Sequence, residues 1–363
     1  MRILVINSGS SSLKLGLIGP DDSVLESDHL PPFDHAAEQA LTDVIRGYGH
    51  IDAIGHRIVH GGDTYTGPVR IDRAVVQRLQ ALSDLAPLHQ PRSLAVVDTV
   101  MSLLPDAPAV ACFDTAFHAG LPAAAATYAL PREWRQRWQL RRYGFHGLSH
   151  SYSSRRAAKL LDRTQDGLRL VTCHLGAGAS LTAVRDGRSI DTTMGFTPIE
   201  GLVMATRSGN VDPGLLLWLA QRPEMTLEDL ADGLEHRSGL AGLAGTPDMR
   251  AVLAAAEDGA PEARLAVDVY IHRLRAGIAA MAASLGGLDC LAFTGGVGEN
   301  APTVRQHAAD GLGFLGIAID EDRNRGNAGD GEIGSTSATV ATLVISARED
   351  LEIALEVRQV LEQ

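Results

Sequence analysis

Short apolar runs separated by small or polar residues organise the N-terminal part of the chain. The run RILVI is followed by NSGSSS, then by LKLGLI, a Pro-Asp-Asp turn and SVLESDHL. Apolar runs of this length with turn residues between them are typical of β-strands. The pattern therefore predicts three consecutive strands joined by two tight turns.

The same pattern returns in the middle of the chain. The runs LRLVTC, SLTAV and RSIDTTM follow one another there, separated by HLGAGA and by an Asp186-Gly187 turn. Small-residue hairpins are common, so chance similarity is one explanation. The positions of the two copies, and a third glycine-rich segment GGVGEN at 295–300 after the run CLAFT, favour a duplicated domain with a nucleotide in the cleft between the copies.

Helical periodicity fills much of the remaining chain. Residues 73–85 place their apolar side chains on one stripe, and residues 349–362 form a last amphipathic helix. Residues 262–285 predict a long helix that is apolar on more than one side, which fits a domain core or a dimer seam, with the core favoured. We expect a further helix at about 301–311 and a hinge near 118–122.

Composition and charge restrict the partners of the protein. At 363 residues the chain is long enough for two domains. Its formal net charge of −12 argues against binding to nucleic acid or to an anionic membrane. An anionic small substrate would then need local cations, so arginines inside apolar or glycine-rich segments carry the most weight.

The cysteines and the N-terminus predict a cytoplasmic protein. Cys112, Cys173 and Cys290 lie far apart in apolar runs, which is typical of buried reduced thiols. The sequence begins directly with a strand-like run, and no apolar run reaches the roughly 18 residues of a membrane span.

Two glycine-rich segments are candidates for binding phosphate. In NSGSSSLK, from Asn7 to Lys14, backbone N–H groups and serine hydroxyls can close on an anion, and Lys14 adds a cation. In GGVGEN, a glycine turn between a strand and a helix exposes backbone donors. The chain contains no G-x-x-x-x-G-K-[ST] motif, so it is not a P-loop protein.

Two arginines are candidates for contacting an anionic substrate. Arg57 lies in the apolar segment GHRIVHGG, where it must either pair with a carboxylate or face an anion in a cleft. Arg207 lies among small residues in ATRSGNVDP, a setting that suits phosphoryl transfer. The same segment also resembles a helix start, and the two interpretations are compatible. Its candidate capping residues are Ser208, Asn210 and Asp212, before Pro213.

Three further residues have both a chemical and a structural interpretation. Asp114 follows an apolar run and could hold a metal-bound water, orient an arginine or cap a turn. His146, beside Phe145, could donate a hydrogen bond to a phosphoryl oxygen, although a histidine in this setting is more often a core residue. Glu349 could hold Mg²⁺, or it could form a capping box with Ser346.

Ten ordered segments resemble the acetate kinase family, and together they span essentially the whole chain. They are NSGSSSLK, GHRIVHGG, LAPLHQP, FDTAFH, RYGFHGLSH, HLGAGAS, TRSGNVDP, GTPDMR, FTGGVGEN and the final RED. The resemblance implies an α/β chain with the duplicated ribonuclease-H-like (actin-like ATPase) fold. It also implies an N-terminal domain of residues 1–118 plus 351–363, and a C-terminal domain of residues 119–350 that carries most of the nucleotide site.

The resemblance implies an activity and its cofactors. The family transfers the ATP γ-phosphoryl group reversibly to acetate, uses Mg²⁺ (with Mn²⁺ as an alternative) and forms homodimers. Propionate or another short carboxylate is the alternative substrate. Two other functions stay open: a nucleotide-binding switch with weakened turnover, and a sugar or glycerol kinase. Pyrophosphate or another nucleotide is an alternative phosphoryl donor, because Ala177 lies in the phosphate loop HLGAGA.

The same resemblance assigns roles to residues of this chain. Arg57 would bind the acyl substrate and, with Arg207, neutralise the transferred phosphoryl group. Asp114 would be the active-site acid, and His146 would stabilise the transition state. Asn7 and Glu349 would form the metal site. The acyl pocket would be lined by Val59, Leu88, Phe145 and Pro198. The ATP-binding residues would be Lys14, Ser10, Ser12, His174, Leu175, Gly176, Ala177, Gly178, Asp248, Met249, Arg250, Gly296, Val297, Gly298, Glu299 and Asn300.

Three positions depart from the family pattern. Ala177 stands where asparagine is usual, so one side-chain donor is lost from a phosphate loop. Gln90 replaces an asparagine, and Asn210 replaces an aspartate. None of these changes removes a catalytic candidate, so we expect activity to be retained while the rate and the substrate range can differ.

Overall fold

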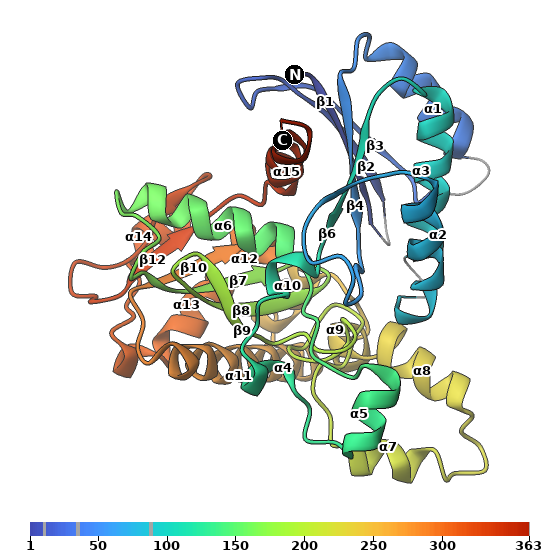
Figure 1. Cartoon of the computed structure of the whole chain (residues 1–363). Coiled ribbons are helices and arrows are strands. Elements are labelled where there is room, and N and C mark those ends of the chain that lie inside the picture. The colour runs from blue at the N-terminus through green and yellow to red at the C-terminus, as the bar shows by residue number, and fades with distance from the viewer. Residues whose placement is uncertain (10–11, 34–36, 87–89, 363) are drawn as a thin grey trace. The chain divides into compact units, whose positions relative to one another are not determined.

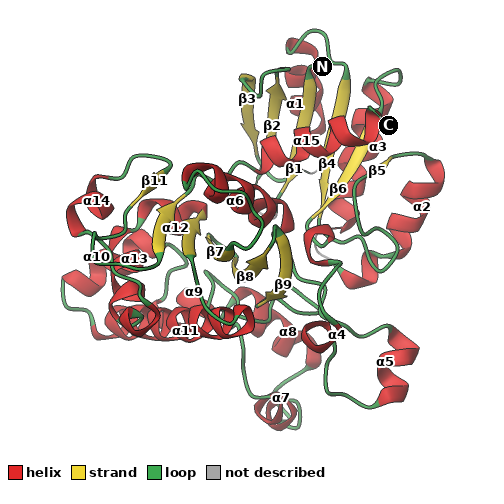
Figure 2. Cartoon of the chain, turned by 60° about the vertical axis from the view of Figure 1, so that its left-hand side comes forward, coloured by secondary structure: helices red, strands yellow, loops and turns green. Residues whose placement is uncertain are grey.

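The computed structural model describes residues 1–9, 12–33, 37–86 and 90–362. They form two compact units, each with one mixed β-sheet and helices (Figures 1 and 2). Unit 1 comprises Met1–Ala119, Phe145–Tyr152 and Arg348–Gln363, and unit 2 comprises Gly120–Gly144 and Ser153–Ala347. The α/β fold class is confirmed, whereas the domain boundaries given above remain a prediction.

The sheet of unit 1 has the strand order β3-β2-β1-β4-β6-β5. Strands β1, β2 and β3 form the antiparallel meander that the sequence predicts. Strands β4 and β6 continue the sheet parallel to β1, and β5 closes it antiparallel to β6. The strands are β1 Ile3–Ser8, β2 Leu13–Ile18, β3 Val24–Leu30, β4 Ala53–Ile58, β5 Val69–Arg70 and β6 Ala109–Phe113.

The sheet of unit 2 repeats this arrangement in the order β11-β12-β10-β7-β8-β9. Strands β7, β8 and β9 form the second meander, β10 and β12 are parallel to β7, and β11 is antiparallel to β12. The strands are β7 Arg169–Leu175, β8 Ala179–Arg185, β9 Arg188–Thr192, β10 Cys290–Thr294, β11 Gly331–Glu332 and β12 Ala341–Val344.

The duplication extends to local irregularities of the two meanders. The register shifts after Leu17 where β2 meets β3, and after Ala183 where β8 meets β9; each is the fifth residue of its strand. A bulge bends and twists a sheet locally and is a retained feature of a fold. Its recurrence at the same position in both copies therefore indicates a common origin of the two meanders. Duplication, rather than chance similarity, therefore explains the sequence repeat.

Helices cover both faces of the sheet of unit 1 (Figure 1). Helices α1 (Ala37–Gly47), α2 (Arg73–Ala81) and α3 (Gln90–Leu103) pack on one face. The C-terminal helix α15 (Glu349–Leu361) packs on the other, through Ile353, Ala354 and Val357. Gly55 of β4 permits this close approach, because a Cβ there would lie 2.4 Å from Cγ2 of Ile353.

The long helix of unit 2, α11 (Pro261–Leu285), buries one face and packs against β7, β8, α9, α10 and α13. Of the two roles predicted for this helix, packing in the domain core is therefore the one observed. Figures 1 and 2 show α6 (Gly147–Leu160), which begins in unit 1, on the opposite face of the sheet of unit 2. The other helices of unit 2 are α4 Ala123–Ala126, α5 Arg132–Trp138, α7 Pro213–Leu219, α8 Leu227–His236, α9 Gly239–Ala244, α10 Met249–Glu257, α12 Gly295–Asn300, α13 Pro302–Asp310 and α14 Glu321–Gly326.

Two expectations are corrected here. The glycine segment 295–300 is itself the helical turn α12, and the helix expected at 301–311 is α13. The expected helix 73–85 ends at Ala81 and is followed by a 3-10 turn at Ser83–Leu85. The three cysteines are buried and free, as predicted. Within the described ranges, no helix is both long and apolar enough to cross a bilayer.

Candidate active site

Arg57 and Asp114 form a bidentate ion pair in unit 1. Arg57 lies on β4, and Asp114 directly follows β6. These two strands are parallel neighbours, so both side chains reach the same edge of the sheet. Nε of Arg57 donates to Oδ1 of Asp114 at 2.8 Å, and Nη2 donates to Oδ2 at 2.6 Å. Asp114 is only 1% exposed. The sequence requires Arg57 either to pair with a carboxylate or to face an anion in a cleft, and the structure shows the pairing with a carboxylate.

Asn7 and Glu349 extend this pair into a network of four side chains. Asn7 lies near the end of β1; its Oδ1 accepts a hydrogen bond from Nη1 of Arg57 at 2.8 Å, and its Nδ2 donates to Oε2 of Glu349 at 2.6 Å. Glu349 is the first residue of α15, and its Oε2 lies 3.6 Å from Nη1 of Arg57. Three strand ends and one helix start thus meet at a single guanidinium.

The capping-box interpretation of Glu349 is wrong. The N-cap position of α15 is Arg348, which makes no side-chain cap. The backbone N–H of Ser346 donates to Asp330 instead. The carboxylate of Glu349 therefore belongs to the Arg57 network and does not serve to start its own helix.

The network is charged, and its charges shift the pKa values of its members. Burial alone would lower the pKa of Arg57, but the carboxylates of Asp114 and Glu349 outweigh it and raise that pKa above its ordinary value. Burial raises the pKa of Asp114, although the charge and hydrogen bonds of Arg57 oppose the rise. Two carboxylates surround one guanidinium, so the cluster keeps one excess negative charge when all three are ionised.

His146 is attached to the same aspartate through its backbone. It precedes α6 with φ +55°, a left-handed conformation that is uncommon for a non-glycine residue. Its backbone N–H bonds to the carboxylate of Asp114, and the N–H of Gly147 donates to the Asp114 carbonyl at 2.8 Å. A Cβ at position 147 would lie 2.2 Å from that oxygen, so glycine is required there.

Two residues expected to line the acyl pocket are buried in unit 1. Val59 follows β4 and is 7% exposed; Phe145 is 1% exposed and meets the ring of His60 edge-on at 5.6 Å. Pro198 belongs to unit 2, and Leu88 lies outside the described residues. The pocket as a whole therefore stays a prediction.

Arg207 lies in a loop of unit 2, and its guanidinium has few partners. Nη1 of Arg207 donates to the carbonyl of Pro198 at 3.3 Å and lies 3.9 Å from Sδ of Met204. Among the described residues, no carboxylate lies within ion-pair distance of it. Burial lowers its pKa, against a weaker opposing effect of Glu235. A buried guanidinium in this state is suited to receiving an anion.

The helix-start interpretation of this segment also holds. Asp212 accepts a hydrogen bond from the N–H of Gly214 and caps α7, whose first residue is Pro213. Asn210 is not the cap, because its Oδ1 accepts from the N–H of Gly201 at 2.9 Å. An aspartate could accept the same hydrogen bond, which accounts for the departure from the family pattern at position 210.

The turn between β1 and β2 and the turn between β7 and β8 are closed in the same way. The N–H of Gly9 donates to the carbonyl of Ser12, and the N–H of Gly176 donates to the carbonyl of Gly178, both at 2.9 Å. Ser10 lies outside the described residues, and Lys14 is exposed on β2. In the second turn, the carbonyl of Ala177 accepts from the N–H of Ala205 at 3.0 Å.

Unit 2 brings two of the three predicted nucleotide segments together. A Cβ at Gly295 would lie 2.8 Å from the carbonyl oxygen of Leu175, so the glycine lets α12 rest on the end of β7. The third segment is the start of α10, where Asp248 is the N-cap. Arg250 forms an exposed ion pair with Asp248 at 2.8 Å.

The residues proposed for the metal fit a cation that arrives with other ligands. The described residues contain no group of three His, Cys, Asp or Glu side chains that could hold a metal alone. Asn7 and Glu349 offer an amide and a carboxylate oxygen, which are hard donors, in a cluster with excess negative charge. Mg²⁺ is typically bound by one or two carboxylates together with water and substrate phosphates.

Sequence reasoning missed a second polar cluster in unit 2. Glu200 accepts from the hydroxyl of Tyr128 at 2.5 Å and from Nη2 of Arg142 at 2.6 Å. Arg142 also donates to the carbonyls of Thr193 and Met194. The cluster folds the loop that carries Pro198. Its members are spread over seventy positions, so no local motif could have identified it.

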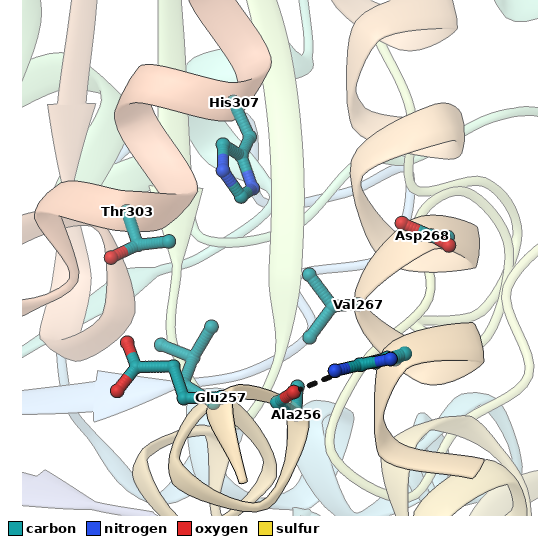
Figure 3. A pocket seen from close by; sticks show the side chains of 8 residues that line it. Ala256, Glu257, Val267, Asp268, Thr303 and His307 are labelled. Atoms are coloured by element: carbon teal, nitrogen blue, oxygen red, sulfur yellow. Dashed lines mark hydrogen bonds between the residues drawn. The ribbon is translucent and has the colours of Figure 1, made fainter. Parts of the chain in front are cut away.

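A pocket of about 260 Å³ lies between α10, α11 and α13 (Figure 3). Its lining includes Glu257, Val267, Asp268 and His307, and the lining residue Arg264 donates to the carbonyl of Ala256 at 3.1 Å. None of the predicted site residues lines it. We therefore assign the chemistry to the Arg57 and Arg207 regions.

Comparisons with known proteins agree with the motif pattern. Residues 22–355 match the model of the acetokinase family. An acetate kinase of Gloeobacter violaceus is 50% identical over 317 residues, covering 87% of this chain and 78% of that one. An acetate kinase of Clavibacter michiganensis is 46% identical, with 97% of each chain covered.

Solved structures agree as well. The acetate kinase of Porphyromonas gingivalis has a TM-score of 0.91 at 35% identity, with 99% of both chains covered. A propionate kinase of Francisella tularensis has a TM-score of 0.92 at 36% identity, also with 99% coverage.

Proposed function

This chain belongs to the acetokinase family, and from that premise we propose that it catalyses the ATP-dependent phosphorylation of acetate to acetyl phosphate. The observation that carries the proposal is the Arg57 network, a buried and oriented guanidinium at the carboxyl ends of three strands. A sugar kinase would need a polar site that matches hydroxyl groups. In this chain the apolar residues Val59 and Phe145 are instead buried in the same unit as Arg57.

The reaction requires alignment and charge stabilisation more than acid–base chemistry. The acetate carboxylate is already a nucleophile: one of its oxygens bonds to the γ-phosphorus while the bond from that phosphorus to the bridging oxygen breaks and leaves ADP. Arg57, held by Asp114, binds and orients the acyl carboxylate. Arg207 and Arg57 neutralise the transferred group, and His146 donates a hydrogen bond to it.

A divalent cation, Mg²⁺ or alternatively Mn²⁺, would be held by Glu349 and Asn7 when ATP is bound. When bound, it supplies positive charge for the phosphoryl group. The residues 174–178, 248–250 and 296–300 hold the nucleotide, and Ser10, Ser12 and Lys14 contact its phosphates.

The choice between acetate and propionate depends on the apolar pocket. The residues Val59, Leu88, Phe145 and Pro198 face the methyl group of the acyl substrate. One additional methylene is worth only about 1–3 kcal/mol in such a pocket. We rank acetate first and propionate second.

We also propose a cytoplasmic homodimer of two-domain subunits, with residues 1–118 and 351–363 in one domain and 119–350 in the other. The main apolar face of α11 is buried within unit 2, so that face does not supply the dimer surface. Exposed apolar side chains on α7 and at the start of α8 are better candidates. They are Leu215, Leu217, Trp218 and Leu227. Sedimentation analysis of Leu217→Asp should then show monomers.

Hydroxylamine trapping of acyl phosphate tests the activity. Purified protein is incubated with Mg²⁺, ATP and acetate, propionate or butyrate, and pyrophosphate replaces ATP in a parallel series. Acetyl hydroxamate should be the main product with ATP. Protein that binds ATP but yields no hydroxamate with any acid would overturn the proposal in favour of a nucleotide-binding switch.

A further inference from the structure

Arg305 is a buried arginine that the proposed mechanism does not use. It lies on α13 and is 1% exposed, which makes it the largest fully buried side chain among the described residues. A buried charge is costly unless it is paired and hydrogen-bonded. Arg305 has no carboxylate partner among the described residues, and burial lowers its pKa to about 10. It is still a cation at neutral pH.

The partners of Arg305 are neutral oxygens at one end of α12. Nη1 of Arg305 donates to the carbonyls of Gly298 and Glu299, both at 2.8 Å. These carbonyls belong to the last turn of α12, where no further turn of helix supplies donors. A cation at this position also interacts favourably with the negative end of the helix dipole.

Asn324 completes the coordination of the guanidinium. It is 2% exposed on α14; its Oδ1 accepts from Nε of Arg305 at 2.7 Å, and its carbonyl accepts from Nη2 at 2.8 Å. The Nδ2 of Asn324 donates to the carbonyl of Pro302, the first residue of α13. The fork of Arg305 thus connects α12, α13 and α14 through directional hydrogen bonds.

Two other contacts hold the remaining sides of α12. Gly295 rests against the end of β7, as described above. Oε1 of Glu299 accepts from the N–H of Ala347 at 3.0 Å. Without Arg305, the turn would be held at its start and by the Glu299 side chain, while the carbonyls at its end would lose their donors.

We propose that Arg305 is a positioning residue that fixes the backbone of residues 296–300 in the conformation that binds ATP. This inference rests on the proposed function, because that is where the segment is assigned to the nucleotide. A planar guanidinium with several donors in a fixed geometry is suited to this task, and the single ammonium of a lysine cannot replace it.

The test compares Arg305→Lys with Arg275→Lys. Arg275 also donates to a backbone carbonyl of α13, that of His307 at 2.8 Å, but it is only partly buried, which makes it a matched control. We expect Arg305→Lys to raise the Kd and KM for ATP about tenfold or more, with KM for acetate and kcat changed less than about threefold. Arg275→Lys should change none of these values. The Kd is measured calorimetrically without acetate, and folding is checked by thermal unfolding.

A second variant covers the case in which Arg305→Lys does not fold. Asn324→Ala removes only the acceptor of Nε and the donor to Pro302, and it should raise the Kd for ATP in the same direction. An unchanged Kd in a folded variant would overturn the inference. Wild-type protein that binds ATP but forms no acyl phosphate would overturn the proposed function and leave the Kd test of Arg305 intact.

Discussion

Arg57 and Arg207 are both largely buried arginines, but their surroundings differ in kind. Arg57 has a bidentate aspartate, an asparagine and a glutamate around its guanidinium, and its pKa is raised. Arg207 has one backbone carbonyl and a thioether sulfur, and its pKa is lowered. Each belongs to a different compact unit.

The difference indicates two uses of the same side chain. The charge of Arg57 is already compensated, so its main property is a fixed orientation, which suits holding a carboxylate substrate in line. Arg207 has no ion-pair partner among the described residues, so an anion gains more by approaching it. This division agrees with the proposed roles in binding and in charge stabilisation.

Removing either guanidinium should have the largest effect on activity. We expect Arg57→Ala and Arg207→Ala each to lower kcat by about 1,000-fold or more, because both act on the transferred phosphoryl group. Initial rates of hydroxamate formation measure this, with exposed Arg222→Ala as a control that should remain active. Near-wild-type turnover in either variant would refute the mechanism.

Replacing these two arginines should also have clearly different effects on the free energy of unfolding. Arg57→Met leaves Asp114 buried without its partner and should lower the free energy of unfolding by about 3–5 kcal/mol. Arg207→Met leaves no buried carboxylate unpaired and should change it by less than about 1 kcal/mol. Urea unfolding at pH 7 gives both values. If the double variant Arg57→Met/Asp114→Leu failed to recover stability, the loss could not be attributed to the unpaired aspartate.

Mild acid should lower the free energy of unfolding of unit 1, because several of its histidines are buried. Burial lowers the pKa of His56 to about 3, and those of His60 and His118 to about 4. In the unfolded chain these histidines have their ordinary pKa of about 6.5, so below that pH the unfolded state binds more protons than the folded state. The free energy of unfolding therefore falls as the pH decreases from about 6.5 towards 4. Each histidine should contribute about 1.4 kcal/mol per pH unit to that slope.

Urea unfolding between pH 4.5 and 8 measures this dependence. His56→Gln is the informative variant, because it removes one of the three titrating groups and should reduce the slope by one proton. A slope identical to that of the wild type would mean that His56 does not resist protonation in the folded protein.

Reverting the two conservative departures from the family pattern should have the smallest effects on stability, and we expect the two effects to differ. In unit 1, Gln90 is fully buried and its Nε2 donates to the carbonyl of His60 at 3.1 Å; the shorter Gln90→Asn should lose this bond and about 1–2 kcal/mol of stability. In unit 2, Asn210→Asp keeps the acceptor for Gly201 and should change stability by less than about 0.5 kcal/mol. Equal costs at both positions would contradict these assignments.

Local chemistry explains why much of the fold could be predicted from the sequence. The strands of both meanders follow from apolar runs and turn residues. The capping box at Ser346 and Glu349 failed because the helix begins only at Glu349, whose carboxylate instead accepts a hydrogen bond from Asn7, 342 positions away. A local motif carries no information about such a distant partner.

The sequence by itself determined the repeated strand pattern, the family, and the residue types that the chemistry needs. Only the tertiary structure decided which of these residues are partners. Arg57 pairs with Asp114 because β4 and β6 are neighbours in the sheet, whereas Arg207 has no such neighbour among the described residues. Turn and strand preferences act over a few residues, but the state of a buried charge depends on groups that distant segments bring within about 4 Å.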